Sequence, residues 1–159
     1  MMEWVKEFTA CNEREASPYI LHAADLILSR ARGATALEEH ELEAEISKCI
    51  NDVLESYDAI ICPTVVSRGF AAGDDYIDHG IEVGGESLEF YWDSAMTIPF
   101  NIMSRCPVLN VPSGFARNGI PTGMQIVGRT SDDATPFKIG AAYEKLKPWF
   151  DIANRRPLI

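Results

Sequence analysis

The fold of this chain is decided by residues 106–128, CPVLNVPSGFARNGIPTGMQIVG, in which two apolar runs flank an Asn-Gly pair. Asn-Gly between apolar runs is the strongest short-range signal of a β-hairpin. We therefore predict one strand over residues 107–115 and a second over residues 123–127. A third run, residues 58–64 (DAIICPT), is continuously apolar until Pro63. Such a run is typical of a strand buried on both faces, as in a parallel sheet flanked by helices.

Two helices are predicted ahead of these strands. Residues 17 and 18 are Ser-Pro, which favours a helix start because Ser caps free N–H groups and Pro has the φ of a first helical turn. Gly33 predicts the end of that helix. Thr35 and Glu38 have the spacing of a capping box, which predicts a second helix to about residue 56.

The segment between the strands is less regular. Residues 67–89 are rich in Gly, Asp and Ser and predict a loop excursion with a small hairpin at residues 84–85. A helix over about residues 93–104 is expected to contain Pro99, an unfavourable interior residue. A last helix is expected over residues 135–146.

The order of these elements predicts an α/β fold class, with helices packed on a partial mixed sheet. We expect a single partial domain over residues 1–159. Residues 1–56 are its helical part, and residues 57–159 hold the strands, the loop excursion, the hairpin and the C-terminal helix. About three strands are predicted, fewer than the roughly 4–6 of a typical sheet. The sheet is therefore predicted to be incomplete.

Charge and composition exclude several function classes. The 159 residues include 24 acidic and 14 basic side chains, a formal net charge of −10 at pH 7. Nucleic-acid surfaces need clustered positive charge, so we expect no nucleic-acid partner. No apolar run approaches the roughly 18 residues of a membrane span, and no apolar stretch follows Lys6 as in a secretory signal. We expect no membrane association and a cytoplasmic location.

From residue 58 onward the chain resembles the C-terminal part of the amidase signature family. Four segments in family order carry the resemblance: YDAIICPT (57–64), TIPFN (97–101), CPVLNVPSG (106–114) and GIPTGMQIVG (119–128). They resemble the family's D-apolar-apolar-x-P-T strand, its T-x-P-F-N helix and its two following strands. One departure is NIMSRCP, residues 101–107, which is one residue longer than the family's N-x-x-G-x-P and has no Gly. The resemblance implies the C-terminal portion of an amidase-signature fold.

The resemblance also implies a chemistry. Family members hydrolyse amide bonds through a serine nucleophile, which a second serine in a cis peptide connects to a lysine base, and they use no cofactor. These residues lie upstream of the matched segments in the family. No substitute is evident here, because GGES at residues 84–87 is the only Gly-Ser cluster and reads as a turn, and the lysines fall on expected helices or their ends. We expect no catalytic residue in this chain and no activity of the chain alone.

Three residues are candidates for substrate contact. By resemblance, Thr97 is expected to line the acyl pocket, with Trp92 and Met96 as further contacts. Ordinary packing against the sheet is the alternative for Trp92 and Met96, and Asn101 is expected to be structural, satisfying backbone groups at a helix end. A small amide is the expected substrate, only in the context of a complete enzyme.

The cysteines are far apart, which argues against zinc and disulfides. They are Cys11, Cys49, Cys62 and Cys106. Cys49 and Cys62 are expected to be small buried hydrophobic residues. A Cys–His nucleophilic pair with His22, His40 or His79 is formed in space rather than in sequence, so that alternative stays open here.

Two further alternatives concern binding. Asp74, Asp75, Asp78 and His79 gather in one loop, where oxygen ligands suit a hard cation. Their spacing fits no calcium loop, and a solvated loop without metal is the expectation. The chain is also a candidate for a non-catalytic binding or assembly module, with copies pairing through an open sheet edge.

Overall fold

The computed structural model describes residues 2–12, 14–30, 35–103 and 105–149. Its contacts divide the chain into two compact units, one of Met1–Leu42 with Gly69–Ser94 and one of Glu43–Arg68 with Ala95–Ile159. The expectation of one partial domain over residues 1–159 stays a prediction. None of the described helices is long and apolar enough to cross a membrane.

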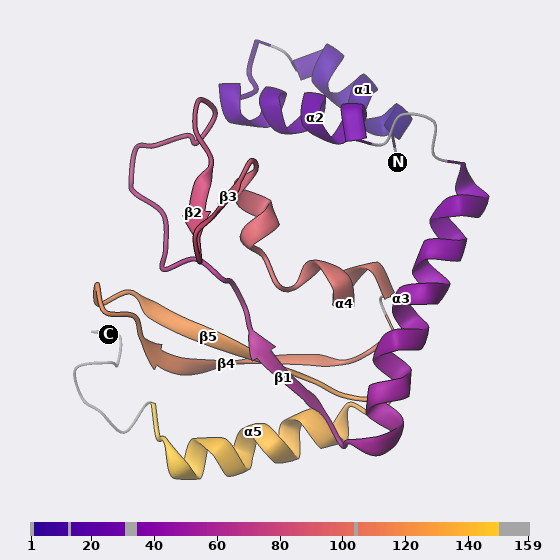
Figure 1. The fold of residues 1–159 in the computed structure, drawn as a ribbon, viewed down its shortest axis with the longest axis vertical. Helices are drawn as coiled ribbons and strands as arrows, with labels where there is room; N and C mark the ends of the chain where they lie inside the picture. Colours follow the sequence, from indigo (N-terminus) through magenta and orange to yellow (C-terminus); the bar gives the residue numbers. More distant parts are fainter. Residues whose placement is uncertain (1, 13, 31–34, 104, 150–159) are drawn as a thin grey trace. The chain divides into compact units, whose positions relative to one another are not determined.

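The elements follow one another as expected from the sequence, with shifted ends (Figure 1). They are α1 (Met2–Asn12), α2 (Pro18–Arg30), α3 (Ala36–Ser56), β1 (Ile60–Pro63), β2 (Ile81–Val83), β3 (Glu86–Leu88), the 3₁₀ turn η1 (Tyr91–Ser94), α4 (Ile98–Met103), β4 (Val108–Phe115), β5 (Pro121–Val127) and α5 (Ala134–Leu146).

The larger sheet has the order β1-β5-β4, with both pairs antiparallel. The predicted Asn-Gly turn between β4 and β5 is confirmed. Gly119 has a φ of 83°, and the Ala116 N–H donates to the Ile120 carbonyl at 2.9 Å. The Asn118 side-chain oxygen accepts from the Ile120 N–H at 3.3 Å. Local turn chemistry therefore sets the register of this hairpin.

The expectation for β1 is wrong in one respect. The strand pairs antiparallel with β5, and its burial alternates along the chain. Ile61 is 57% exposed, so β1 is not buried on both faces. It lies at one edge of the sheet order, and a run of four apolar residues does not determine which neighbour it pairs with or in which direction.

The two faces of this sheet pack against different helices. On one face, Val127 is fully buried in a cluster with Leu54 of α3 and Cys106, and Ile60 packs against it. The other face meets α5, which runs alongside the strands in Figure 1. A Cβ at Gly140 of α5 would lie 2.6 Å from Leu109 Cδ2. Only glycine allows this close approach of helix and strand.

The predicted capping box at the start of α3 is confirmed. The Thr35 N–H donates to Glu38 Oε2 at 2.7 Å, and the Glu38 N–H donates to Thr35 Oγ1 at 3.2 Å. The hydrogen bond from the Thr35 backbone holds the pKa of the Glu38 carboxyl below its ordinary value. Gly33, the predicted end of α2, lies outside the described residues.

The expected helix over residues 93–104 is divided in two. Its first part is the 3₁₀ turn η1, and α4 begins only at Ile98. Pro99 is thus the second residue of α4 rather than an interior residue. A first-turn proline loses no intrahelical hydrogen bond, because those N–H groups have no partner in any helix. The proline therefore sets where the helix begins.

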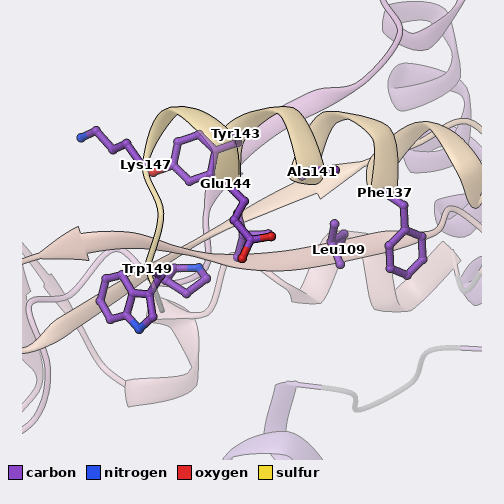
Figure 2. A pocket seen from close by; sticks show the side chains of 10 residues that line it. Leu109, Phe137, Ala141, Tyr143, Glu144, Lys147 and Trp149 are labelled. Carbon is purple, nitrogen blue, oxygen red and sulfur yellow. The ribbon is translucent and has the colours of Figure 1, made fainter. Parts of the chain in front are cut away.

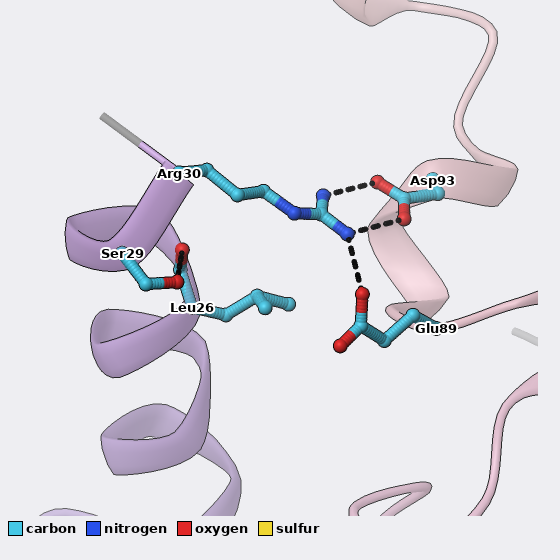
Figure 3. Close-up of polar contacts among 5 residues, drawn as sticks. All are labelled: Leu26, Ser29, Arg30, Glu89 and Asp93. Atoms are coloured by element: carbon cyan, nitrogen blue, oxygen red, sulfur yellow. Dashed lines mark hydrogen bonds and ion pairs between the residues drawn. The ribbon is translucent and has the colours of Figure 1, made fainter. Parts of the chain in front are cut away.

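The unit that contains α2 is joined by an ion-pair cluster and stacked rings. Arg30 donates to Asp93 through both terminal nitrogens, at 3.2 and 3.3 Å, and to Glu89 at 3.3 Å (Figure 3). These bonds, the one to Asp93 first, raise the pKa of Arg30. The rings of Tyr19 and Phe90 stack with centroids 5.9 Å apart. In the same unit, β2 and β3 form the predicted hairpin, whose two turn glycines both have a positive φ.

Arg129 ties the C-terminal end of α3 to the end of β5. Its Nε donates to the Leu54 carbonyl at 2.7 Å, and its Nη2 donates to the Tyr57 carbonyl at 3.2 Å. The last carbonyls of a helix have no intrahelical donor, and a cation there also favours the helix dipole.

We predict that Arg129→Met lowers the free energy of unfolding by about 1–2 kcal/mol, because a charged donor to two carbonyls is lost. Urea denaturation of the purified chain measures the change. Arg117→Met, which removes a cation from the exposed hairpin loop, is the matched control and should change stability by less than about 0.5 kcal/mol. Equal effects of the two variants would contradict this role of Arg129.

Candidate functional site

A pocket of about 190 Å³ lies where the start of α4 meets the face of the larger sheet. Its seven lining residues come from segments far apart in the sequence. They are Thr64, Thr97, Phe100, Asn101, Val108, Asn110 and Gln125. All seven are uncharged, and five of them carry a hydroxyl or carboxamide. We call this the Thr97 pocket.

Strand register explains why these side chains meet. Asn110 of β4 pairs with Gln125 of β5, which in turn pairs with Cys62 of β1. Paired residues in a sheet point to the same face. Thr64 is two residues beyond Cys62 and Val108 is two residues before Asn110, so both continue this face. The polar floor of the pocket is therefore fixed by the sheet.

Gln125 is the most tightly held residue of the pocket, with 1% of its surface exposed. Its Nε2 donates to the Pro63 carbonyl at 3.0 Å and to the Met96 carbonyl at 3.1 Å. One side chain thus joins β5, the end of β1 and the residue before Thr97. Its Oε1 is buried, and no group in the described part of the chain donates to it.

Thr64 and Asn110 form a second polar pair, with the Thr64 hydroxyl donating to Asn110 Oδ1 at 2.8 Å. The Thr64 N–H donates to the Gly123 carbonyl at 3.2 Å, and the Thr64 carbonyl accepts from the Met96 N–H at 3.0 Å. A Cβ at Gly123 would lie 2.8 Å from Thr64 Oγ1 and 3.0 Å from Asn110 Oδ1. The Thr64–Asn110 bond therefore needs glycine at position 123.

The structure separates the three predicted contact residues. Thr97 is half-buried and lines the pocket. Met96 is half-buried and takes part through its backbone N–H and carbonyl. Trp92 belongs to the other compact unit, is 46% exposed, and has its ring centroid 5.5 Å from that of Phe90. Substrate contact by these residues stays a prediction.

The sequence interpretation missed Thr64, Asn110 and Gln125 as site residues. Asn110 and Gln125 each interrupt an apolar strand. A carboxamide on a strand that packs against a core must find hydrogen-bond partners or face a cavity. That pattern was the available signal.

The cysteines offer no activated thiolate in their described contacts. Burial raises the pKa of the Cys62 thiol, and Gln125 Nε2 lies 3.5 Å from its sulfur. Cys106 is buried, with its sulfur 3.9 Å from the Thr130 hydroxyl. Cys49 is exposed, so its expected burial is wrong. Neighbouring Val53 on α3 is 43% exposed as well, which shows that this stripe of the helix is only partly covered in the structure.

A second pocket, of about 300 Å³, lies between α5 and β4. Figure 2 shows Phe137 and Glu144 extending from α5 beside Leu109, with Trp149 at the far end. Most of its lining is apolar, and Phe137 is 65% exposed. This groove offers contact area rather than a reactive group.

The acidic loop uses its carboxylates on its own backbone. Asp74 accepts from the Tyr76 N–H at 2.9 Å, and Asp75 accepts from the Ile77 N–H at 3.2 Å. His79 Nε2 lies 3.2 Å from Asp74 Oδ2. Among the described residues, no group of three or more His, Cys, Asp or Glu side chains is placed to hold a metal ion.

Comparison with known proteins decides the family. A model of the amidase family matches residues 7–136. The chain belongs to the amidase family. A subunit of the glutamyl-tRNA(Gln) amidotransferase of Thermosynechococcus vestitus is 39% identical over 95 residues, which are 60% of this chain and 18% of that protein.

Solved structures give the fold of this amidase-family chain. A bacterial aryl acylamidase of the amidase signature family matches 99% of the chain and 34% of its own, with a TM-score of 0.73 and 23% identity. The corresponding glutamyl-tRNA(Gln) amidotransferase protein of Thermotoga maritima matches 93% of the chain and 32% of its own, with a TM-score of 0.55 and 28% identity. The predicted family and fold class are confirmed. The chain spans about a fifth to a third of the length of these relatives.

We predict that Gln125→Met lowers the free energy of unfolding by about 2–4 kcal/mol, because the Pro63 and Met96 carbonyls lose their donor in a buried place. Met is of similar length, so the change isolates the carboxamide. Urea denaturation measures the loss.

Thr122→Val is the control for this prediction. It removes one hydroxyl of the half-buried Ser113–Thr122 pair on the same strand and should cost about 1 kcal/mol or less. A Gln125→Met variant as stable as Thr122→Val would contradict the role assigned to the Gln125 amide.

The acidic loop yields a pH prediction. The hydrogen bond to the Gly80 carbonyl and, next, the Asp74 carboxylate raise the pKa of His79 above its ordinary value. A raised pKa stabilises the fold at pH values below the unfolded pKa, and this contribution is lost as the pH rises through the folded pKa.

Asp74→Asn removes the charge and keeps an acceptor for the Tyr76 N–H. NMR titration should show the pKa of His79 falling toward about 6.5. The variant should lose more stability at pH 5 than at pH 8. An unchanged His79 titration would show that Asp74 does not act on the imidazole.

Proposed function

We propose that the chain is the C-terminal segment of an amidase-type hydrolase. In this role it supplies β1, β4 and β5 to the core sheet and the Thr97 pocket to the wall of the acyl site. The observation that carries the proposal is the Thr97 pocket itself. It is a cavity with a buried carboxamide, built from the same segments that resemble the family's motifs.

Two observations support a partial rather than a complete catalytic apparatus. The chain spans 18% of one curated relative and 34% of the aryl acylamidase. The sequence also holds no paired serines in a Gly/Ser-rich stretch with a preceding lysine. A neutral hydroxyl needs a positioned base to attack an amide, and the oxyanion that forms needs preorganised N–H donors. In this proposal those groups come from the remainder of the amidase fold.

The reaction of the complete enzyme is hydrolysis of a carboxamide by water to a carboxylate and ammonia. The substrate is a small amide, and no metal or redox cofactor takes part. The names of the relatives, an aryl acylamidase and an amidotransferase, support chemistry at an amide bond. The seven uncharged residues of the Thr97 pocket act by shape and hydrogen bonding rather than as acid or base.

A specific observation favours a second function, non-catalytic assembly. β1 and β4 are the two edges of the larger sheet, and Ile61, Val108 and Phe115 on them are 57%, 40% and 49% exposed. Exposed edges favour strand pairing. In that case copies of the chain associate through these strands. Sedimentation equilibrium distinguishes the two, because only assembly gives a concentration-dependent increase in mass.

The proposed function predicts that the purified chain releases no ammonia from benzamide or acetamide above the buffer blank. Residues 57–128, grafted in place of the matching segment of the aryl acylamidase, should retain hydrolysis of an acylated aniline. A graft carrying Gln125→Met should lose it. An ammonia-coupled assay and the absorbance of the released aniline measure the two activities.

Two results would count against the proposal. One is ammonia release by the isolated chain that a serine-directed inhibitor abolishes, since the chain would then hold its own nucleophile. The other is a folded graft, verified by circular dichroism and a cooperative melt, that has no activity while the parent enzyme is active.

A further inference from the structure

We infer that the Thr97 pocket selects an uncharged group that donates a hydrogen bond, and that Gln125 Oε1 is the acceptor that reads it. The inference rests on the proposed function only for its meaning as substrate selection. As a statement about binding, it rests on the pocket alone. It names Gln125 and Thr97 as specificity-determining residues.

The first argument is charge. Each of the seven lining side chains is neutral. A carboxylate or an ammonium group that leaves water for such a surrounding has no counter-charge to compensate its lost hydration. A neutral group of the same shape loses much less. The lining therefore discriminates against charged groups whichever sign they carry.

The second argument is the fixed orientation of the Gln125 amide. Nε2 donates to two carbonyls, at 3.0 and 3.1 Å, so a flipped amide would place Oε1 against two other acceptors. The oxygen is therefore held in place as an acceptor. It is buried without a donor in the described part of the chain, which is unfavourable for a polar atom. A ligand N–H or O–H removes that penalty, and a ligand with acceptors only does not.

The third argument is size and apolar lining. Phe100 and Val108 give the pocket apolar walls beside its polar floor. The pocket volume of about 190 Å³ slightly exceeds the ~150 Å³ of an apolar cavity that holds benzene. A single ring or short branched chain that bears one neutral donor group fits these dimensions.

The Thr64 hydroxyl does not compete for the same role. It donates to Asn110 Oδ1 at 2.8 Å, so this donor and this acceptor are already paired. Of the pocket's carboxamide oxygens in the described structure, the Gln125 oxygen is the one that is both buried and unpartnered. The preference for a donor over an acceptor follows from this difference.

Four probes of nearly equal shape separate charge from hydrogen bonding. Benzamide is neutral with an N–H donor, methyl benzoate is neutral without a donor, benzoate is an anion, and benzamidine is a cation. Two-dimensional NMR titration of the full chain follows the Gln125 side-chain amide and the Thr97 backbone amide. Benzamide should bind saturably, and each of the other three should bind at least about tenfold more weakly.

A charge variant tests the same inference without removing the Gln125 bonds. Thr97→Asp places a carboxylate in the pocket and should reverse the preference between benzamide and benzamidine. Thr130→Asp puts the same charge on an exposed residue outside the pocket and should leave the wild-type order unchanged. A cooperative melt of both variants establishes that they are folded.

Three outcomes would overturn the inference. They are no saturable binding of benzamide, equal or tighter binding of methyl benzoate or benzoate, and the same probe order in Thr97→Asp as in Thr130→Asp. The graft experiment remains independent of these titrations. An active graft with an unselective pocket would retain the proposed function and reject Gln125 Oε1 as the selecting acceptor.

Discussion

The hydrogen bonds of one buried carboxamide hold together three segments that lie far apart in the sequence. Gln125 stands in the central strand β5 and donates both to the end of β1 and to Met96, just before α4. Backbone pairing alone joins β1 to β5, but it does not fix the chain that leads into α4. The position of Thr97 therefore depends on a side chain of the sheet, and the pocket's shape and stability share one cause.

This arrangement gives the sheet two different faces. The face toward α5 is apolar, and Leu109 comes so close to the helix that position 140 admits only glycine. The opposite face changes along each strand from apolar to polar. Val127 belongs to the core with α3, whereas Gln125, two residues earlier on the same face, belongs to the Thr97 pocket. Core and pocket are therefore neighbouring parts of a single surface, and the core supports the pocket's polar row.

Local signals in the sequence predicted local structure well. Asn118-Gly119 and the Thr35–Glu38 box satisfy their own backbone groups, so their conformations need no distant partner. Non-local features were less accessible. The pairing of β1 with β5 depends on the topology, and the start of α4 depends on what precedes Pro99. Gln125 was passed over as a site residue because its partners are two carbonyls, which no side-chain pattern reveals.

The glycine at position 123 has a consequence for how such a pocket diverges over evolutionary time. Any side chain there would collide with the Thr64–Asn110 pair, so substitutions that reshape the floor are eliminated together with the fold. Position 97 at the rim carries no such burden, since Thr97 is half-buried. New specificities in this lineage would then arise by exchange at the entrance, while the depth of the cavity is inherited unchanged.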